Sequence, residues 1–317
     1  MVKELAISTR GLTKQFEKHV AVNDVDLDIQ MGEVYGLIGP NGAGKTTLIR
    51  MLATAEEPTT GEIYINGDRL GNFHELNPSF KRRLGYLPDD YPLYEDLTVW
   101  DYLDYFARLY RLREPRRTQR LHEVLELVQL GNKRHSQIST LSRGMKQRLS
   151  LARTIIHEPI LLLLDEPVSG LDPIARMQFR EIIKALQEAG MTILISSHVL
   201  SDLAELCTSV GIMELGFLVE STSLTKLYQR LSKQQVFIST LGNLEVLVRE
   251  LKKNPWVEEY ELILNKNTVR INFSGTEEDC ADLLRSLINS NIPVTDFHCT
   301  QEDLETIFLK LGHKQAS

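Results

Sequence analysis

Residues 39–47 read GPNGAGKTT, after a short apolar run and before a helical pattern. The glycines in this segment allow a backbone so tight that successive N–H groups point inward and form a nest for an anion. Lys45 adds a positive charge, and the Thr46 hydroxyl stands where a magnesium ion would be bound. The spacing G-x-x-x-x-G-K-[ST] between a strand and a helix predicts a loop that holds the phosphates of a nucleoside triphosphate. The alternative is a flexible glycine loop without a ligand.

The segment ILLLLDEP places two carboxylates directly after an apolar run, Ile160–Leu164. This run predicts a parallel strand buried on both faces, with Asp165 and Glu166 at its carboxyl end. Ligands bind at that edge of open α/β sheets. Asp165 is suited to hold a metal ion and Glu166 to accept a proton from an attacking water, as phosphoryl transfer requires. The alternative is that both acids only cap a following helix.

A histidine follows the next predicted strand. Asp172 and Pro173 are the residue types of a helix N-cap and first turn, and the helix they begin is predicted to end at Gly190. The run Thr192–Ser197 then predicts a second buried strand, which delivers His198 to the same sheet edge as the two carboxylates. A purely structural histidine is the alternative, but the position at the ligand-binding edge favours a catalytic one.

The stretch LSRGMKQRLSLAR, residues 141–153, predicts the start of another helix. Ser142 is a preferred N-cap type, and the free amides of a helix start attract anions. Arg143, long and charged, stands unexpectedly in the first turn. The apolar face of the helix consists of Met145, Leu149, Ala152 and Ile156. Arg143 is predicted to point away from that face and from the core.

Composition limits the classes of function for these 317 residues. A net charge of −7 argues against broad, non-specific nucleic-acid binding. Cys207, Cys280 and Cys299 are scattered and lack C-x-x-C spacing, which indicates neither a disulfide framework nor a zinc site and fits a reducing compartment. The N-terminus lacks the apolar core of a signal peptide, and no apolar run approaches the roughly 20 residues that span a bilayer. We therefore expect a cytoplasmic chain that reaches a membrane only through a partner.

About 50 residues before Ser142 have a helical pattern. The residues at spacings of three and four, which predict a core-facing stripe, are Val99, Leu103, Phe106 and Tyr110. The following RLREPRRTQR contains five arginines in ten residues. A solvated loop between helices is the favoured interpretation, and contact with phosphate or lipid headgroups is the alternative.

The chain after residue 222 has a separate pattern of predicted strands and helices. A linker helix, STSLTKLYQRLS, precedes a predicted order of strand, helix, two strands, helix and strand, which ends at PVTDFHCT. This βαββαβ order is that of the ferredoxin-like fold. A closing helix is predicted at DLETIFLKL, residues 303–311. We therefore expect domains at 1–222, with a helical subdomain at about 89–157, and at 223–317.

These motifs, in this order, resemble the ATP-binding cassette (ABC) ATPases over about residues 3–220. GPNGAGKT resembles the family's Walker A loop, LLLLDEP its Walker B strand with the adjoining glutamate, and SGLD its D-loop. SSHVL resembles the histidine switch, and LSRGM takes the place of the signature motif. The resemblance implies an α/β fold of the P-loop NTPase type, with a parallel-sheet core, an antiparallel β subdomain and a helical subdomain, beside the small ferredoxin-like α+β domain.

The resemblance also implies roles for individual residues. The phosphate-binding set is Gly39, Pro40, Asn41, Gly42, Ala43, Gly44, Lys45, Thr46 and Thr47. The catalytic set is Lys45 on the β- and γ-phosphates, Glu166 as general base and His198 as a sensor of the γ-phosphate. Thr46 and Asp165 are implied to bind Mg²⁺, and Phe16 to stack on adenine, although Phe16 as a core residue is the alternative.

In the family, two cassettes pair head to tail, and the signature of one caps the ATP held by the other. The residues implied at that shared surface are Ser142, Arg143 and Gly144, with Asp172 in the D-loop. The sequence departs from the usual signature at Arg143 and Met145, where glycine and glutamine are usual. We predict that Arg143 adds positive charge near the partner's phosphates or ribose.

Asp89 departs from the family pattern in the Q-loop, where glutamine is usual. A carboxylate there is shorter and charged, yet it can bind Mg²⁺ or hold water. Some exporter-type cassettes have an acidic residue at this position, so we interpret Asp89 as a mark of that subfamily and a candidate magnesium and nucleotide ligand.

The resemblance implies an ATP-hydrolysing subunit of an ABC transporter. The ending EDLETIFLKL resembles the tails of single-cassette subunits of bacterial exporters, which favours export. The implied partners are a separate transmembrane permease and a second ABC subunit, in a homodimer or a heterodimer, on the cytoplasmic face of the membrane, with no specific nucleic acid. The alternatives are a soluble ABC ATPase that acts on ribosomes or DNA, and a regulator whose C-terminal domain senses a ligand.

Overall fold

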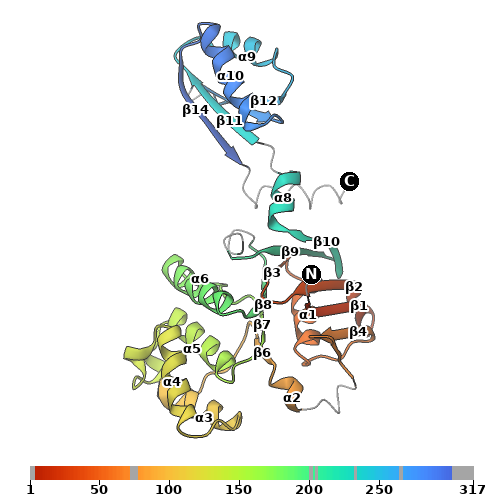
Figure 1. Cartoon of the computed structure of the whole chain (residues 1–317), viewed down its shortest axis with the longest axis vertical. Helices are drawn as coiled ribbons and strands as arrows, with labels where there is room; N and C mark the ends of the chain where they lie inside the picture. The colour runs from red at the N-terminus through yellow and green to blue at the C-terminus, as the bar shows by residue number, and fades with distance from the viewer. Residues whose placement is uncertain are drawn as a thin grey trace. The chain divides into compact units, whose positions relative to one another are not determined.

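The apolar runs beside the candidate residues form the centre of a six-stranded sheet in the computed structural model of the chain (Figure 1). In spatial order the strands are β10 (Phe217–Ser223), β9 (Ser209–Glu214), β3 (Val34–Ile38), β8 (Thr192–Ser197), β7 (Leu161–Leu164) and β6 (Leu84–Leu87). Neighbours pair in parallel except β10, which is antiparallel to β9. Every residue of β3, β7 and β8 is buried, as expected of strands covered on both faces. The predicted strands Val34–Ile38 and Thr192–Ser197 are confirmed, whereas Ile160 precedes β7 and is 41% exposed.

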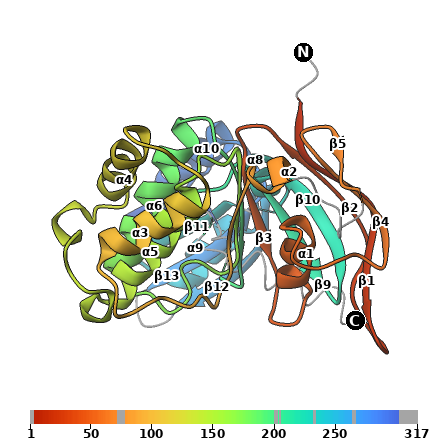
Figure 2. The ribbon, with the colours of Figure 1, turned by 90° about the horizontal axis from the view of Figure 1, so that it is seen from below.

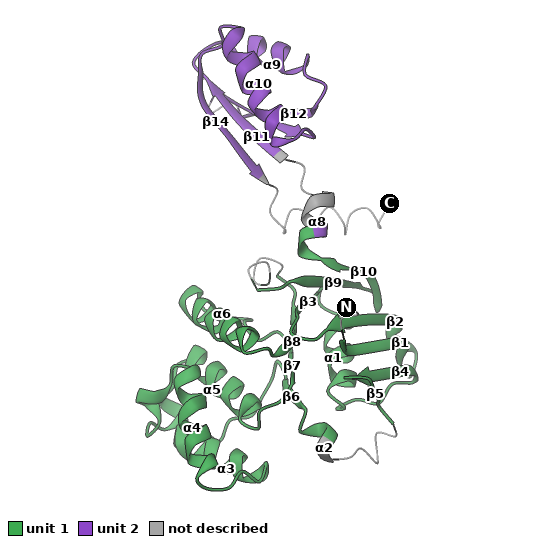
Figure 3. Cartoon of the chain, viewed as in Figure 1, with its two compact units in different colours: residues 1–225 green, residues 226–317 purple. Residues whose placement is uncertain are grey.

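The structure describes residues 4–71, 78–199, 203, 206–231, 234–263 and 267–301. The chain divides into two compact units, residues 1–225 and 226–317, which Figure 3 colours separately. The change of unit falls within helix α8 (Leu224–Leu231). Within the described residues, every helix is too short or too polar to cross a membrane.

Two helices leave the carboxyl edge of the six-stranded sheet, and their ends follow from local residue types. Helix α1 (Lys45–Leu52) begins directly after Gly44, and α6 (Pro173–Glu188) begins after the N-cap Asp172. The Ala175 N–H donates to Asp172 Oδ1 over 2.9 Å, which confirms the predicted helix start. A shorter helix, α2 (Pro78–Lys81), precedes β6.

A second, antiparallel sheet packs on α1. Its strands, in spatial order, are β2 (His19–Gln30), β1 (Leu5–Phe16), β4 (Thr60–Ile65) and β5 (Asp68–Arg69). Residues of β2 alternate between buried and exposed from Asp24 to Ile29, which places one face of the sheet in the core. That face shares a single hydrophobic cluster with α1 and with β7.

Three helices form a separate arm of unit 1, on the side of the parallel sheet away from β1, β2 and β4 (Figure 2). They are α3 (Val99–Leu109), α4 (Arg116–Leu127) and α5 (Arg143–Ile155), with short 3₁₀ turns η2 (Gly131–Lys133) and η3 (Ile138–Thr140). The Asp101 N–H donates to the Thr98 hydroxyl at the start of α3 over 3.1 Å.

The stripe predicted on α3 is partly right. Val99 and Leu103 are fully buried, but Phe106 and Tyr110 are only half-buried, and Tyr102 takes the core position instead. Residues at spacings of three and four cover a face wider than 100°, so a stripe chosen from them alone can be rotated from the true core direction.

The arginine-rich segment contributes more to the packing of the arm than its sequence indicates. Its second half forms the start of α4, although the sequence predicts a loop. Arg117 Nε pairs with an Asp104 carboxylate oxygen over 2.9 Å, and Arg120 Nη2 donates to the Ile155 carbonyl over 2.7 Å. These contacts tie α4 to α3 and to the end of α5, so the charges serve the packing of the arm.

Helix α5 is buried on more than its apolar face. Gln147, Arg148 and Ser150 are buried, whereas Met145 is only half-buried. Arg148 Nη1 donates to the Val128 carbonyl over 3.0 Å, at the end of α4. The prediction of one apolar face was therefore too narrow, because α5 is the central helix of the arm and a polar side chain such as Arg148 also bonds to a neighbouring helix.

Unit 2 contains one antiparallel sheet covered by two helices. Its strands, in spatial order, are β12 (Val257–Ile263), β13 (Thr268–Phe273), β11 (Gln234–Thr240) and β14 (Val294–Gln301). Its helices are α9 (Leu244–Leu251) and α10 (Glu277–Asn289). The chain order βαββαβ and this strand order are those of the ferredoxin-like fold, as predicted. The closing helix predicted at 303–311 lies outside the described residues.

Candidate active site

The loop between β3 and α1 passes so close to neighbouring backbone that two of its glycines cannot be replaced. A Cβ atom at Gly39 would lie 2.3 Å from the Met213 carbonyl oxygen. One at Gly44 would lie 2.2 Å from the Ala21 carbonyl oxygen, and Gly44 has a φ of +101°. Only glycine combines this conformation with such approach. The loop that the sequence predicts to hold an anion therefore lies at the junction of β3, β9 and β2.

Lys45 is the buried cation of this loop. Its side chain is only 6% exposed, and Nζ donates to the carbonyls of Gly39 over 2.7 Å and Pro40 over 3.2 Å. Nζ also lies 3.4 Å from Glu166 Oε1. The ammonium group thus joins the glycine loop to the acidic end of β7, and it is already desolvated where a phosphate would be held.

Asp165, at the end of β7, meets two hydroxyl groups from other elements. The Thr46 hydroxyl donates to Asp165 Oδ1 over 3.2 Å, and the Ser196 hydroxyl donates to the same oxygen over 2.8 Å. The other oxygen, Oδ2, is buried and has no hydrogen-bond partner. Burial raises the pKa of this carboxyl, which the two hydroxyl groups only partly offset. A buried carboxylate oxygen without a partner, beside a threonine hydroxyl, fits a ligand for a divalent cation.

Ser196 is a residue that sequence reasoning missed. Besides its bond to Asp165, its hydroxyl accepts from the Glu166 N–H over 2.9 Å, so one buried side chain fixes both acidic residues. Ser196 is the fifth residue of strand β8, and a polar residue directly after the apolar Ile193–Ile195, in a strand predicted to be buried, was the available signal.

Glu166 and His198 form a hydrogen-bonded pair. His198 Nδ1 lies 2.7 Å from Glu166 Oε2, and the other Glu166 oxygen faces Lys45. Glu166 has a φ of +47°, in the left-handed region that few residues other than glycine adopt. This conformation turns the side chain toward both partners. Four predicted residues therefore lie close together, as expected of residues at one sheet edge: Lys45, Asp165, Glu166 and His198.

A groove of about 390 Å³ opens beside Glu166. It is lined by Asp89, two residues after β6, and by Arg143, Lys146 and Ser169. Burial raises the pKa of Asp89 above its ordinary value, and the nearby Glu166 adds to that rise, while Arg143 opposes it. The structure thus places Asp89 beside the acidic cluster, and carboxylates in such surroundings attract a cation.

The start of α5 borders the same groove. The Met145 N–H donates to the Ser142 hydroxyl over 3.3 Å, which confirms Ser142 as the N-cap. Arg143 does not point freely away from the chain: its Nη2 donates to the Ser169 carbonyl over 3.1 Å. The sequence places Arg143 opposite the apolar face, but it does not show that the loop before α6 lies within reach.

Comparison with known proteins identifies the family. The family model described as "ABC transporter" matches residues 22–169. The bacitracin transport ATP-binding protein BcrA of Enterococcus faecalis is 33% identical over 313 residues, which cover 98% of this chain and 97% of that protein. The chain belongs to the ABC transporter ATP-binding proteins. The linearmycin resistance ATP-binding protein LnrL of Bacillus subtilis is 30% identical and covers 96% of this chain and 97% of its own length.

A solved structure agrees with this assignment. The ATP-binding subunit of an ABC transporter superposes with a TM-score of 0.63 at 31% identity, over 71% of this chain and 92% of its own. ABC ATP-binding proteins are ATPases, and the ABC nucleotide-binding fold is the one described above for unit 1. The predicted family and fold class are therefore confirmed.

The remaining candidate residues of this ABC protein lie in three further places. Pro40, Asn41, Ala43 and Thr47 belong to the glycine loop and its helix start. Phe16 lies at the end of β1 and is 42% exposed, with the Lys14 ammonium 4.9 Å from the ring centre. A ring this exposed is available for stacking and is not a core residue. Asp172 uses its side chain to cap α6.

Proposed function

We propose that this ABC protein binds ATP with Mg²⁺ and hydrolyses it as one half of a dimer that energises a separate transmembrane exporter. The observation that carries the proposal is the convergence of Lys45, Asp165, Glu166 and His198 at one sheet edge, with Asp165 Oδ2 buried and without a partner. One site would then contain a phosphate-binding lysine, a metal-binding carboxylate and a proton acceptor.

Asp165 and Thr46 would hold the magnesium ion. Among the described residues no group of three or more histidine, cysteine, aspartate or glutamate side chains is placed to hold a metal, and Mg²⁺ ordinarily needs only one or two protein carboxylates, with water and phosphate oxygens as further ligands. When bound, the ion neutralises charge on the phosphate oxygens. Asp89 is a further candidate ligand at the edge of the site.

Glu166 would accept the proton from the attacking water. Its Oε1 lies 3.4 Å from the Lys45 ammonium, with which it forms an ion pair. A γ-phosphate group that takes Lys45 would free Glu166, while His198 keeps the carboxylate oriented through Oε2. Glu166 would thus be available as a base when substrate is bound, and a general base contributes typically 10²–10⁴-fold to a rate.

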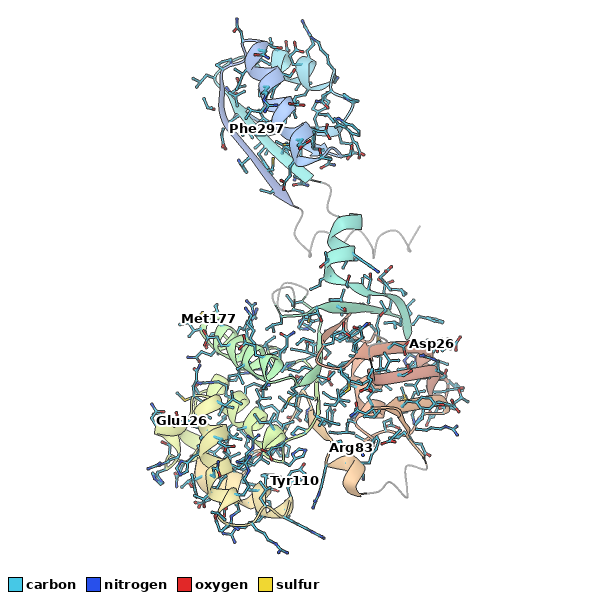
Figure 4. All side chains as sticks on the ribbon, viewed as in Figure 1. Asp26, Arg83, Tyr110, Glu126, Met177 and Phe297 are labelled. Atoms are coloured by element: carbon cyan, nitrogen blue, oxygen red, sulfur yellow. The ribbon has the colours of Figure 1, made fainter. Side chains whose placement is uncertain are left out.

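The second subunit would be another copy of this chain, with a different ABC subunit as the other outcome. Ser142 is exposed at the start of α5, where free amides favour an anion. On α6, Ile174 and Met177 are also exposed, and Met177 is labelled in Figure 4. Exposed apolar side chains together with the amides of a helix start are suited to a partner surface that carries nucleotide.

The helical arm supports a permease contact. Three large side chains are exposed at one place on it: Tyr94, Tyr105 and Leu109. The Tyr94 and Tyr105 rings meet edge to face, with centres 6.1 Å apart. Exposed apolar patches on soluble chains mark interaction surfaces. With BcrA and LnrL as relatives, this patch supports attachment to an exporter on the cytoplasmic face of the membrane.

Attachment is tested with the permease co-produced with the chain in detergent-solubilised membranes. Tyr105→Glu is expected to abolish co-purification while ATP hydrolysis by the isolated chain stays unchanged, because the patch does not include the residues near Lys45. Tyr260→Glu, on the exposed strand β12 of unit 2, is the matched control. Co-purification that survives Tyr105→Glu, or migration of the chain with ribosomes, would contradict the transport proposal.

A further inference from the structure

The guanidinium group of Arg143 lies flat on the loop that joins Glu166 to α6. Its Nη2 donates to the Ser169 carbonyl, and a Cβ atom at Gly170 would lie only 2.5–2.6 Å from three of its atoms. Gly170 has a φ of +65°. The loop is therefore shaped to receive this side chain: residue 170 lacks a Cβ where the guanidinium rests.

Hydrogen bonds within its own backbone also fix the shape of this loop. The Ser169 N–H donates to the Glu166 carbonyl over 3.1 Å, and the Leu171 N–H donates to the Val168 carbonyl over 3.3 Å. The starts of α5 and α6 also touch, since a Cβ atom at Gly144 would lie 2.7 Å from Ala175 Cβ. Arg143 is thus the side chain that closes the loop against the start of α5.

We propose that Arg143 is a positioning residue that holds the loop Val168–Leu171 of its own chain against the start of α5. The inference rests on the proposed dimer, in which both segments meet the second subunit. With the two segments fixed to each other, the chain presents one preformed surface to the partner's nucleotide. This differs from the role expected from sequence, in which Arg143 adds charge near the partner's phosphates.

Amide hydrogen exchange of the nucleotide-free full chain tests the contact without requiring ATP hydrolysis. Arg143→Ala is expected to speed exchange in the segment 167–171 by roughly 2- to 10-fold, because one hydrogen bond of ordinary strength is lost. Lys146→Ala is the matched control: Lys146 lines the same groove but pairs with Glu95, 2.5 Å away, so exchange in 167–171 stays unchanged. Unchanged exchange in Arg143→Ala would overturn the proposal.

A double-mutant cycle tests the geometry. Gly170→Ala is expected to destabilise the chain because its Cβ meets the guanidinium and because φ is positive. In an Arg143→Ala background only the backbone strain remains, so the drop in melting temperature caused by Gly170→Ala should be clearly smaller. Equal drops in both backgrounds would show that Arg143 does not rest on Gly170.

Steady-state kinetics separates positioning from charge. Arg143→Ala is expected to lower kcat with little change in KM for ATP, and Arg143→Lys to behave like Arg143→Ala, because an ammonium group cannot reproduce the planar contact. Full rescue by lysine would favour the charge role instead. If the wild-type chain had no ATPase activity, the proposed function would be wrong. The exchange measurement would still show whether Arg143 holds the loop Val168–Leu171.

A second, independent observation concerns two thiols of unit 2. Cys280 of α10 is buried and 4% exposed, whereas Cys299 of β14 is exposed. Their Sγ atoms lie 3.1 Å apart, although 19 positions separate them in sequence. The scattered cysteines of the sequence gave no sign of this pair, because the ferredoxin-like topology is what brings the helix beside the edge strand.

The geometry points to an oxidation site at which Cys280 and Cys299 form an intramolecular disulfide. With a peroxide as oxidant, the exposed Cys299 sulfur attacks one oxygen of the O–O bond and becomes a sulfenic acid, with release of water. The Cys280 sulfur then attacks Cys299 Sγ, forms the S–S bond and expels the second oxygen as water. The two thiols lose two hydrogens and two electrons, and the peroxide is reduced to two waters.

Thiol titration of the denatured full chain after treatment with hydrogen peroxide tests the site. The number of free thiols is expected to fall from three to one, with an intact mass lower by two hydrogens that dithiothreitol reverses. In Cys207→Ser it should fall from two to none, and in Cys280→Ser the internal bond should not form. Three free thiols in the treated wild type, or a disulfide only between chains, would overturn the assignment.

Discussion

The buried hydroxyl of Ser196 offers the most informative perturbation of the site. It donates to Asp165 Oδ1 over 2.8 Å and accepts from the Glu166 N–H over 2.9 Å, so Ser196→Ala removes both bonds and leaves the N–H unpaired. A hydrogen bond to a charged group contributes about 1.5–3 kcal/mol. Loss of a residue that orients a metal ligand typically costs about 10–100-fold in metal affinity or activity, or roughly 1.4–2.8 kcal/mol. The two estimates agree.

The assay is ATP hydrolysis measured against Mg²⁺ concentration at saturating ATP. We expect Ser196→Ala to raise the Mg²⁺ concentration for half-maximal activity by about 10–100-fold. Ser197→Ala is the matched control, because that hydroxyl also makes two hydrogen bonds, but only to the backbone of Val199. An unchanged Mg²⁺ dependence in Ser196→Ala, or the same shift in Ser197→Ala, would show that Ser196 does not orient a metal ligand.

Three further predictions concern other parts of unit 1. Phe16→Ala is expected to weaken ATP binding by about 5–160-fold, from a stacking contribution of roughly 1–3 kcal/mol, as measured with a fluorescent ATP analogue. Burial lowers the pKa of His157, so the folded state keeps it neutral while the unfolded state binds a proton below its ordinary pKa of 6.5. Stability from His157 is therefore present above that pH and lost below it, and urea midpoints should fall less steeply from pH 7 to pH 5.5 in His157→Phe. Gly144→Ala is expected to cost about 1–3 kcal/mol by overpacking against Ala175, and Ala175→Gly in the same chain should restore much of the melting temperature.

The candidate site was predictable from sequence wherever a residue is fixed by backbone position. Asp165, Glu166 and His198 follow buried parallel strands, so the common sheet edge brings them together whatever their rotamers. The glycine loop is similarly determined by its local residue types. The βαββαβ order of unit 2 was predictable for the same reason, since short alternating strands and amphipathic helices specify their own faces.

Features that depend on where a side chain turns were not predictable. The direction of Arg143 depends on the loop at Gly170, 27 positions away, and the role of Ser196 depends on which strand lies next to β7. The pairing of Cys280 with Cys299 likewise depends on tertiary packing. Periodicity gives the face of a helix but not the partner that a long or polar side chain meets across it.

ATP turnover by Glu166→Gln compared with wild type, together with ATP binding by both, shows whether Glu166 is the general base. The amide keeps the shape of the side chain and can still accept from His198, but it cannot take a proton from water. We expect turnover to fall by about 10²–10⁴-fold, ATP binding to be retained, and the chain to elute as a dimer with ATP and Mg²⁺. Wild-type turnover in Glu166→Gln would contradict this role of Glu166.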